Sequence, residues 1–190
     1  AAHPTPFVAK YDGAGRKDRV VASVWQGAGL AILAGIVLMG LLPVTDDLFA
    51  RMGHEPEVQR YEVEYFSVML WGAGATILSA VLSSFFSGRG QTRVVMYVNG
   101  GVALMNVGLD YALIFGVEGL IPAGGVRGAA LATIIAQYTS VVLFAVLILR
   151  ECRASGYPLW QEFRLDRSLL GRMLGYGTPN GIHCAVGIAG

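Results

Sequence analysis

The sequence predicts an all-α polytopic membrane protein, and three observations lead to this fold class. Of the 190 residues, 54% are hydrophobic and 14% are charged, whereas soluble domains average about 25% charged residues. Glycine supplies 26 residues, and glycine is common in transmembrane helices because small residues let their backbones pack closely. Long apolar stretches also recur along the chain. The net charge of +1 gives no indication of a nucleic-acid partner.

Four complete membrane spans are predicted, because a helix needs about 20 mostly apolar residues to cross the hydrocarbon core. The four stretches cover residues 20–44, 65–86, 94–115 and 126–149. Residues 1–19 are assigned to the end of an earlier span and the loop after it, and residues 169–190 to the start of a further span. We therefore interpret the chain as an internal fragment of a longer protein.

The charges of the connecting loops predict how these spans are oriented, because short cytoplasmic loops are enriched in Lys and Arg. Residues 10–19, 87–93 and 150–172 are basic, residues 43–64 are mostly acidic, and residues 116–125 contain Glu118 and no Lys or Arg. Basic loops therefore alternate with acidic or neutral ones without a break. We expect the basic loops on the cytoplasmic face of a bacterial inner membrane, with residues 150–168 forming an amphipathic helix on that surface.

The third span contains Asp110, which is the only Asp or Glu within the four predicted complete spans. A charge near the middle of a bilayer costs at least a few kcal/mol, so acids there are rare and usually functional. Asn106 lies four residues earlier and therefore on the same helix face. Two such side chains can coordinate a small hard cation such as Na+. Alternatively, burial disfavours the charged carboxylate and favours proton uptake, or Asp110 pairs with a polar group and only fixes helix packing.

Other polar residues within the spans are weaker indications of function. Interhelical hydrogen bonds are the ordinary role of such side chains, and we expect this role for Gln26, Thr76, Thr133, Gln137 and Ser140. Gln26, Gln137 and His183 are also candidates for lining a substrate cavity. The two cysteines, Cys152 and Cys184, lie far apart without a CxxC motif, so no metal or redox site is expected. No nucleophile–base pair or metal-ligand spacing appears, so an enzyme is not expected.

Three stretches of the chain carry a resemblance to a known family. They are FVAKYDGAGRKDRV at residues 7–20, FFSGRGQTR at residues 85–93, and NVGLDYALIFGVEGLIPAGGVRGAALAT at residues 106–133. Their glycine-rich turns do not read as phosphate loops, because no strand precedes them. The third stretch is the most specific, because its Asn-x-x-x-Asp spacing, its IFG ending and its GAALAT restart occur in order. Together these stretches resemble the multidrug and toxic compound extrusion (MATE) family of secondary transporters.

The resemblance implies a twelve-helix fold with two six-helix lobes around a central cavity. Residues 20–149 would be spans three to six of the N-terminal lobe, residues 150–168 the linker between the lobes, and residues 169–190 the start of span seven. It further implies an antiporter that exports organic, often cationic, compounds in exchange for H+ or Na+. We expect a monomer in the lipid bilayer that needs no cofactor.

The resemblance also implies a set of coupling residues. Asp110 and Asn106 match the acid and amide of the family's cation site, Thr133 matches a hydroxyl ligand, and Ala129 matches a backbone carbonyl ligand. Asp110, Asn106 and Thr133 would then be the ligands of Na+ if Na+ is the coupling ion. Many members carry a second acid in span seven, where this chain has Gly187, which favours the N-terminal site. The remaining alternatives are a flippase for lipids or lipid-linked precursors, which needs a cationic cavity, and a membrane structural protein without transport.

Overall fold

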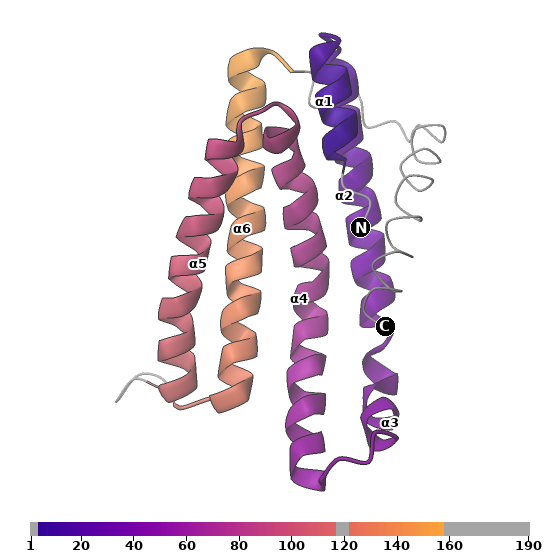
Figure 1. Cartoon of the computed structure of the whole chain (residues 1–190), viewed down its shortest axis with the longest axis vertical. Coiled ribbons are helices and arrows are strands. Elements are labelled where there is room, and N and C mark those ends of the chain that lie inside the picture. The colour runs from indigo at the N-terminus through magenta and orange to yellow at the C-terminus, as the bar shows by residue number, and fades with distance from the viewer. Residues whose placement is uncertain (1–3, 117–121, 158–190) are drawn as a thin grey trace.

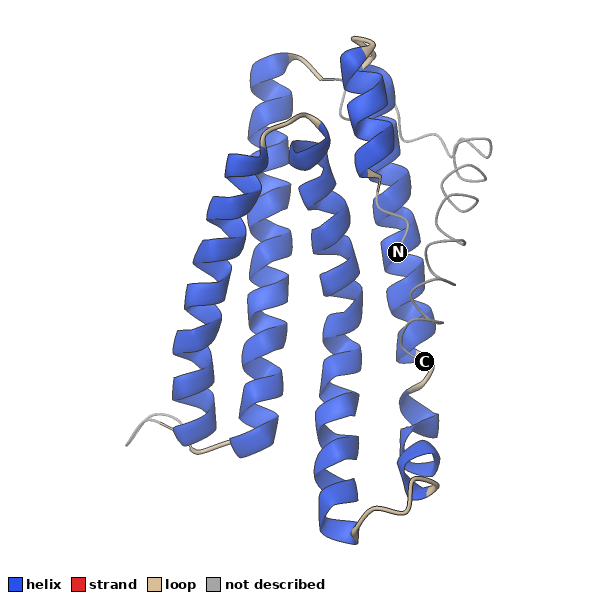
Figure 2. Ribbon diagram, viewed as in Figure 1, coloured by secondary structure: helices blue, strands red, loops and turns tan. Residues whose placement is uncertain are grey.

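The computed structural model describes residues 4–116 and 122–157 as a bundle of α-helices (Figure 1, Figure 2). Neither range contains a strand. The predictions for residues 158–190 lie outside the described residues. They concern most of the amphipathic segment, the start of the further span, His183 and Cys184. The same holds for Glu118.

Four helical segments are long and apolar enough to cross a membrane. They contain α2 (Lys17–Met39), α4 (Pro56–Gly88), α5 (Thr92–Phe115) and α6 (Gly125–Ser155). Three shorter elements complete the described chain, namely α1 (Thr5–Gly13), the 3-10 turn η1 (Leu42–Val44) and α3 (Thr45–Ala50). The segment that contains α2 continues through η1 and α3. The predicted fold class, an all-α membrane protein with four spans in this part of the chain, is therefore confirmed.

Helices α4 and α6 are longer than the spans predicted within them. α4 begins at Pro56 rather than near residue 65, and α6 continues to Ser155 rather than ending near residue 149. Proline suits the first turn of a helix, where its missing N–H would have no intrahelical partner. The 33 residues of α4 make a helix about 50 Å long, which exceeds the hydrocarbon core of about 30 Å. The polar first turns of α4 therefore project beyond the apolar span.

Glycines in the left-handed conformation form the turns at one end of the bundle. Gly15, between α1 and α2, has a φ of 68°, and Gly90, between α4 and α5, has a φ of 73°. Gly156, with a φ of 68°, caps α6. Glycine adopts this conformation without the steric cost that a Cβ brings. The glycine-rich stretches around Gly15 and Gly90 are thus tight turns between helices, as predicted.

Helix α4 lies between α2 and α6, and α5 packs against α6 (Figure 1). Glycines set the distance of α4 from both neighbours. A Cβ on Gly35 of α2 would lie 2.8 Å from the Cα of Gly74, and a Cβ on Gly72 would lie 2.8 Å from Cγ1 of Ile134 on α6. Membrane helices associate through such close backbone contacts because lipid offers little hydrophobic driving force.

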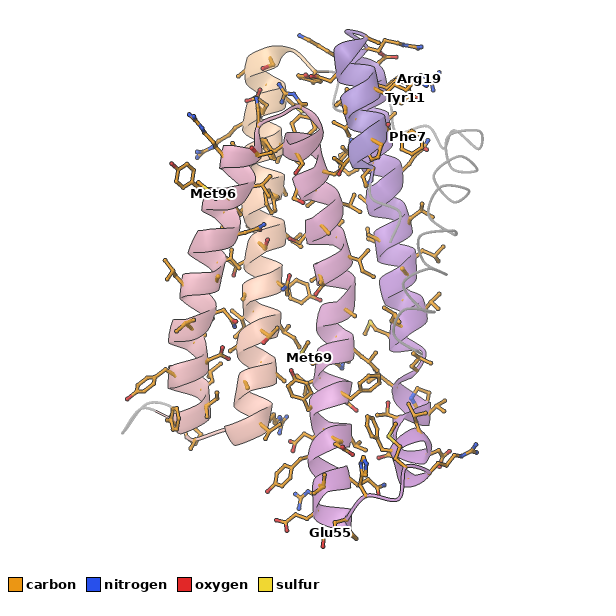
Figure 3. All side chains as sticks on the ribbon, in the orientation of Figure 1. Phe7, Tyr11, Arg19, Glu55, Met69 and Met96 are labelled. Atoms are coloured by element: carbon orange, nitrogen blue, oxygen red, sulfur yellow. The ribbon has the colours of Figure 1, made fainter. Side chains whose placement is uncertain are left out.

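The two ends of the bundle differ in charge, as the loop analysis predicts. Figure 3 labels Tyr11 and Arg19 at the end where α1 turns into α2, and Glu55 at the opposite end, just before α4. The first end also contains the main hydrophobic core, in which Val8, Phe85 and other side chains from α1, α2, α4 and α6 are buried. This end of the bundle is therefore the better packed of the two.

A cluster of five side chains, the Arg89 cluster, ties the helices together at this end. Arg89, only 11% exposed, donates to Oε1 of Glu151 over 2.9 Å, and its Nε lies 3.6 Å from Oδ1 of Asp12. Its guanidinium group lies 4.9 Å from the ring centre of Phe85 and 5.0 Å from that of Tyr157. Burial raises the pKa of Tyr157 above its usual value, so the phenol remains a proton donor to Asp12 at neutral pH. The cluster joins the ends of α1, α4 and α6.

Candidate functional site

The candidate site begins with the face of α5 that carries Asn106 and Asp110. Both side chains are half-buried, whereas the flanking Val107 and Tyr111 are exposed. Asn106 and Asp110 lie about one and two turns after Val102, the one buried residue of α5, on the same side of the helix. Positions three and four residues apart share one side of a helix. The predicted amide and acid therefore lie on the inward side of α5.

Helices α5 and α6 touch through their backbones just beyond this site. The N–H of Gly124 donates to the carbonyl oxygen of Leu113 over 2.9 Å. A Cβ on Gly128 would overlap the same carbonyl oxygen. The glycines that open α6 are thus required for the close approach of the two antiparallel helices. This contact fixes which residues of α5 and α6 lie at the same depth.

The contact between Leu113 and Gly128 places Thr133 at the depth of the α5 pair. At about 1.5 Å per residue, Asp110 lies about 4.5 Å and Asn106 about 10.5 Å before Leu113 along α5. Thr133 lies about 7.5 Å beyond Gly128 along α6, which runs in the opposite direction. Its depth therefore falls between those of the acid and the amide.

The two predicted ligands on α6 are bonded to each other. The hydroxyl group of Thr133 donates to the carbonyl oxygen of Ala129 over 3.1 Å. Within the helix the carbonyl oxygen of Ala129 also accepts the backbone N–H of Thr133, so both of its lone pairs are engaged, whereas the hydroxyl oxygen keeps its own. The Thr133 oxygen can therefore bind a cation as it stands, and the Ala129 oxygen can do so once it releases the Thr133 hydroxyl. No hydrogen bond joins them to Asn106 or Asp110 among the residues that the structure describes.

The amide of Asn106 contains a buried polar atom without a partner. Its Nδ2 atom makes no hydrogen bond within the described ranges, and buried polar groups are rarely left in this state. Rotating the amide by 180° would place the oxygen at the same position. The site therefore has an unused polar group beside Asp110.

Asp110 has no ion pair or hydrogen bond to any described residue. The ion pairs of the described chain lie near the helix ends, for example Arg127 with Glu64 at 3.7 Å. An acid that only fixed helix packing would be expected to have a partner of this kind. Residues 4–116 and 122–157 also contain no group of three or more His, Cys, Asp or Glu side chains that could hold a metal ion. Any cation at this site would rely on amide, hydroxyl and carbonyl oxygens beside one carboxylate.

The candidate cavity residues do not gather in the described structure. Gln26 is 8% exposed, and neither of its side-chain polar atoms has a partner among the described residues. It lies nine residues before Gly35, and nine residues are two and a half helical turns, so it faces away from α4. Gln137 is on α6 and half-buried. A shared cavity for the two glutamines remains a prediction, and His183 lies outside the described residues.

The interhelical hydrogen bonds expected of other polar residues form at only one of these positions. Ser140 on α6 bonds to Ser79 on α4 over 2.7 Å in the buried interior. Thr76 instead donates within its own helix, to the carbonyl oxygen of Gly72 over 3.1 Å. The hydroxyl of Thr133 likewise bonds within α6. Threonine satisfies its hydroxyl locally when no polar group faces it across the interface.

The glycines in the middle of α5 make no close helix contact among the described residues. A Cβ on Gly100, Gly101 or Gly108 would meet no atom within 4 Å. These glycines lie on exposed positions of α5. Gly124 and Gly128 make the close contacts with α5 instead. This could not be predicted, because it depends on the position of Leu113 across the interface. The Arg89 cluster was also missed, because Arg89 lies in a turn that resembles an ordinary basic loop and its two ion-pair partners are 77 and 62 positions away.

Comparison with known proteins gives a family. The model described as MatE matches residues 4–112, which is more than half of the chain. A relative from Thermotoga maritima, described as "Probable multidrug resistance protein NorM", is 34% identical over 169 residues, which cover 87% of this chain and 34% of the relative. A protein of the same description from Bacillus thuringiensis subsp. konkukian is 35% identical over 181 residues, covering 93% of this chain and 39% of the relative. The chain thus spans a little over a third of the length of these relatives.

A solved structure shares the fold. It is described as an "Inward-facing conformation of a multidrug resistance MATE family transporter of the MOP superfamily". The TM-score is 0.76 at 24% identity, over 93% of this chain and 39% of the solved chain. The arrangement of α1 to α6 is therefore that of part of a two-lobed transporter. Proteins of this kind are transporters rather than enzymes and need no cofactor. The match to the family model, supported by these relatives, shows that the chain belongs to the MatE (multidrug and toxic compound extrusion) family of membrane transporters.

Proposed function

We propose that the full-length protein is a monomeric antiporter of the bacterial inner membrane that exports organic, often cationic, compounds in exchange for H+ or Na+. The observation that carries this proposal is Asp110, a half-buried acid without a partner among the described residues. Asn106 shares its helix face, and Thr133 lies at a matching depth on α6. The descriptions of the relatives as multidrug resistance proteins support export of drug-like compounds.

The proposed coupling follows from the cost of burying a charge. In the outward-facing state, Asp110 binds H+ or Na+ and its charge is neutralised. Neutralisation lowers the cost of burying the carboxyl group, so the lobe repacks around the site and substrate leaves to the outside. On the inside the ion dissociates, and the recharged acid again favours a cationic substrate. Ion and substrate then each bias the same two-state equilibrium, which is what coupling requires.

Sodium would be held by oxygen atoms from two helices. The carboxylate of Asp110 and the amide of Asn106 would supply ligands from α5, and the hydroxyl of Thr133 and the carbonyl of Ala129 would supply ligands from α6. A proton would need only the carboxylate. The ions therefore differ in their dependence on Thr133, which provides a way to tell them apart.

Drug efflux by the full-length protein in everted vesicles tests the proposal. The variants are Asp110→Asn and, as a control, Asp47→Asn, which changes an exposed acid of α3. We expect Asp110→Asn to lower gradient-driven efflux about 5- to 150-fold, the factor that ordinary coupling free energies correspond to, while the variant still binds drug. The imposed gradient that drives the wild type identifies the ion, and Thr133→Val should lower efflux only if that ion is Na+. Unchanged efflux in Asp110→Asn would refute the assignment of coupling to this acid.

A further inference from the structure

An apolar groove crosses the bundle near the end where α1 turns into α2. Its lining residues come from three helices: Val21, Val24 and Trp25 of α2, Leu82 and Phe85 of α4, and Ala145, Ile148, Leu149 and Cys152 of α6. The groove holds a cavity of about 130 Å³. It exists because α4 lies between α2 and α6 and keeps them apart. Phe85 and Cys152, each 1% exposed, form its floor, whereas Trp25 and Leu149, 37% and 39% exposed, form its open edges.

The depth of the groove matches the upper acyl-chain region of one leaflet. Val21 lies about 6 Å and Trp25 about 12 Å from the start of α2, while Ala145 lies about 15 Å from the end of α6. A hydrocarbon core of about 30 Å gives each leaflet about 15 Å. The groove therefore opens sideways within the membrane, at the level where the acyl chains of phospholipids begin.

Two cations lie at the membrane-surface end of the groove. Lys17 is one turn before Val21 on the same side of α2, and its ammonium group donates to the carbonyl oxygen of Ser155 at the end of α6 over 2.8 Å. It thus spans the mouth of the groove. Arg153 follows Leu149 by one turn on α6 and is exposed. Neither cation pairs with a carboxylate among the described residues.

These charges select the kind of molecule that fits. An ammonium group has three donors, so Lys17 retains two for an anion after bonding to Ser155. An organic cation would be repelled at this mouth by the charges of Lys17 and Arg153. A phosphate attached to an acyl chain would satisfy both ends of the groove, because basic residues near a membrane surface attract anionic lipids.

We propose that the groove between α2, α4 and α6 binds one acyl chain of an anionic phospholipid, with the phosphate held by Lys17 and Arg153. The lipid would fill the space between α2 and α6 that no side chain of the described residues occupies. It would thereby hold α2 and α6 at the separation that α4 sets. This site is separate from Asp110, so its test does not depend on the proposed antiport.

Native mass spectrometry of the purified full-length protein tests the proposal. The probes are dioleoylphosphatidylglycerol, which is anionic, and dioleoylphosphatidylcholine, which has no net charge. We expect the wild type to retain the anionic lipid preferentially. Lys17→Gln should lower that preference about fivefold, since one basic residue near the surface contributes about that factor. Arg93→Gln is the matched control, because Arg93 is exposed on α5, which supplies no lining residue of the groove, and should leave the preference unchanged.

Filling the groove tests the acyl-chain contact. Ala145→Phe places a ring in the cavity, and Leu143→Phe places the same ring on a different side of α6. We expect lipid retention to fall only in Ala145→Phe. If Ala145→Phe does not fold, Val21→Phe fills the groove from α2. A phosphatidylglycerol with a diazirine in its acyl chain should also label the groove residues of the wild type. Equal retention of both lipids, or unchanged retention in the filled variants, would overturn the proposal. Diazirine labelling only outside the groove would also overturn it, because another part of the full-length protein would then cover the groove.

Discussion

Replacing Arg89 with methionine should open the end of the bundle where α1, α4 and α6 meet. The change removes a charged hydrogen bond of 2.9 Å to Glu151 and a second ion pair, of 3.6 Å, to Asp12. It also removes two cation–π contacts, with Phe85 and Tyr157. Methionine keeps much of the apolar volume of the stem, so the experiment tests mainly the charge and its hydrogen bonds.

The expected loss is about 2–3 kcal/mol. A hydrogen bond to a charged group contributes about 1.5–3 kcal/mol, and a cation–π contact about 0.5–1 kcal/mol. Removing one partner of a buried ion pair costs about 3–5 kcal/mol. We place the effect below that range, because the side chains of Glu151 and Asp12 are 28% and 34% exposed and water can solvate the carboxylates left behind.

Hydrogen–deuterium exchange of the full-length protein measures this loss locally. A loss of about 2 kcal/mol corresponds to about 30-fold faster exchange, and we expect it for amides in the α4–α5 turn and at the end of α6. Arg93→Met is the matched control, since Arg93 is exposed in the first turn of α5 and has no ion pair among the described residues. A double variant, Arg89→Met with Glu151→Met, should recover part of the protection because it leaves no unpaired acid at that position. Equal exchange in the Arg89→Met and Arg93→Met variants would refute the reasoning.

Two further predictions concern helix contacts. Gly128→Ala introduces a Cβ that overlaps a backbone carbonyl of α5, so it should destabilise the α5–α6 contact by about 1–3 kcal/mol and lower the thermal unfolding temperature of the full-length protein. The control, Gly108→Ala, places its Cβ in open space on α5 and should not lower that temperature. Equal effects of the two variants would contradict the contact. Ser79→Ala should cost about 0.6 kcal/mol, the average for a hydrogen bond between membrane helices, and Ser140→Ala combined with it should cost little more, because both partners of the 2.7 Å bond are then absent; additive losses in the double variant would argue against the bond.

The sequence was sufficient to predict the long helices but not their ends. Apolar runs are set by membrane thickness, so the spans within α2, α4, α5 and α6 could be recognised from hydropathy. The start of α4 at Pro56 could not, because its first turns are polar and resemble a loop. The last turn of α6, up to Ser155, contains Glu151, which bonds to Arg89 and accepts a hydrogen bond from Ser155. The contact with Arg89 exists only in the folded chain.

Contacts between distant residues were the part that the sequence could not supply. Glycine occurs throughout the chain, and nothing in the local pattern separates Gly128, which touches α5, from Gly108, which touches nothing within 4 Å. The distinction depends on which side of each helix meets its neighbour. Arg89 likewise resembles any other basic residue of a turn in the sequence. Its partners Asp12, 77 positions earlier, and Glu151, 62 positions later, lie beside it only in the folded chain.

The acids of the described chain differ in a way that bears on the role of Asp110. Glu151 and Asp12 are partly buried, and each has a hydrogen bond or ion pair with Arg89 or Tyr157. This is how an acid that stabilises the fold is expected to look, because a carboxylate removed from water needs a partner. Asp110 is also half-buried, yet no described residue supplies such a partner. A carboxylate without such a partner is available to bind H+ or Na+, as the proposed exchange requires.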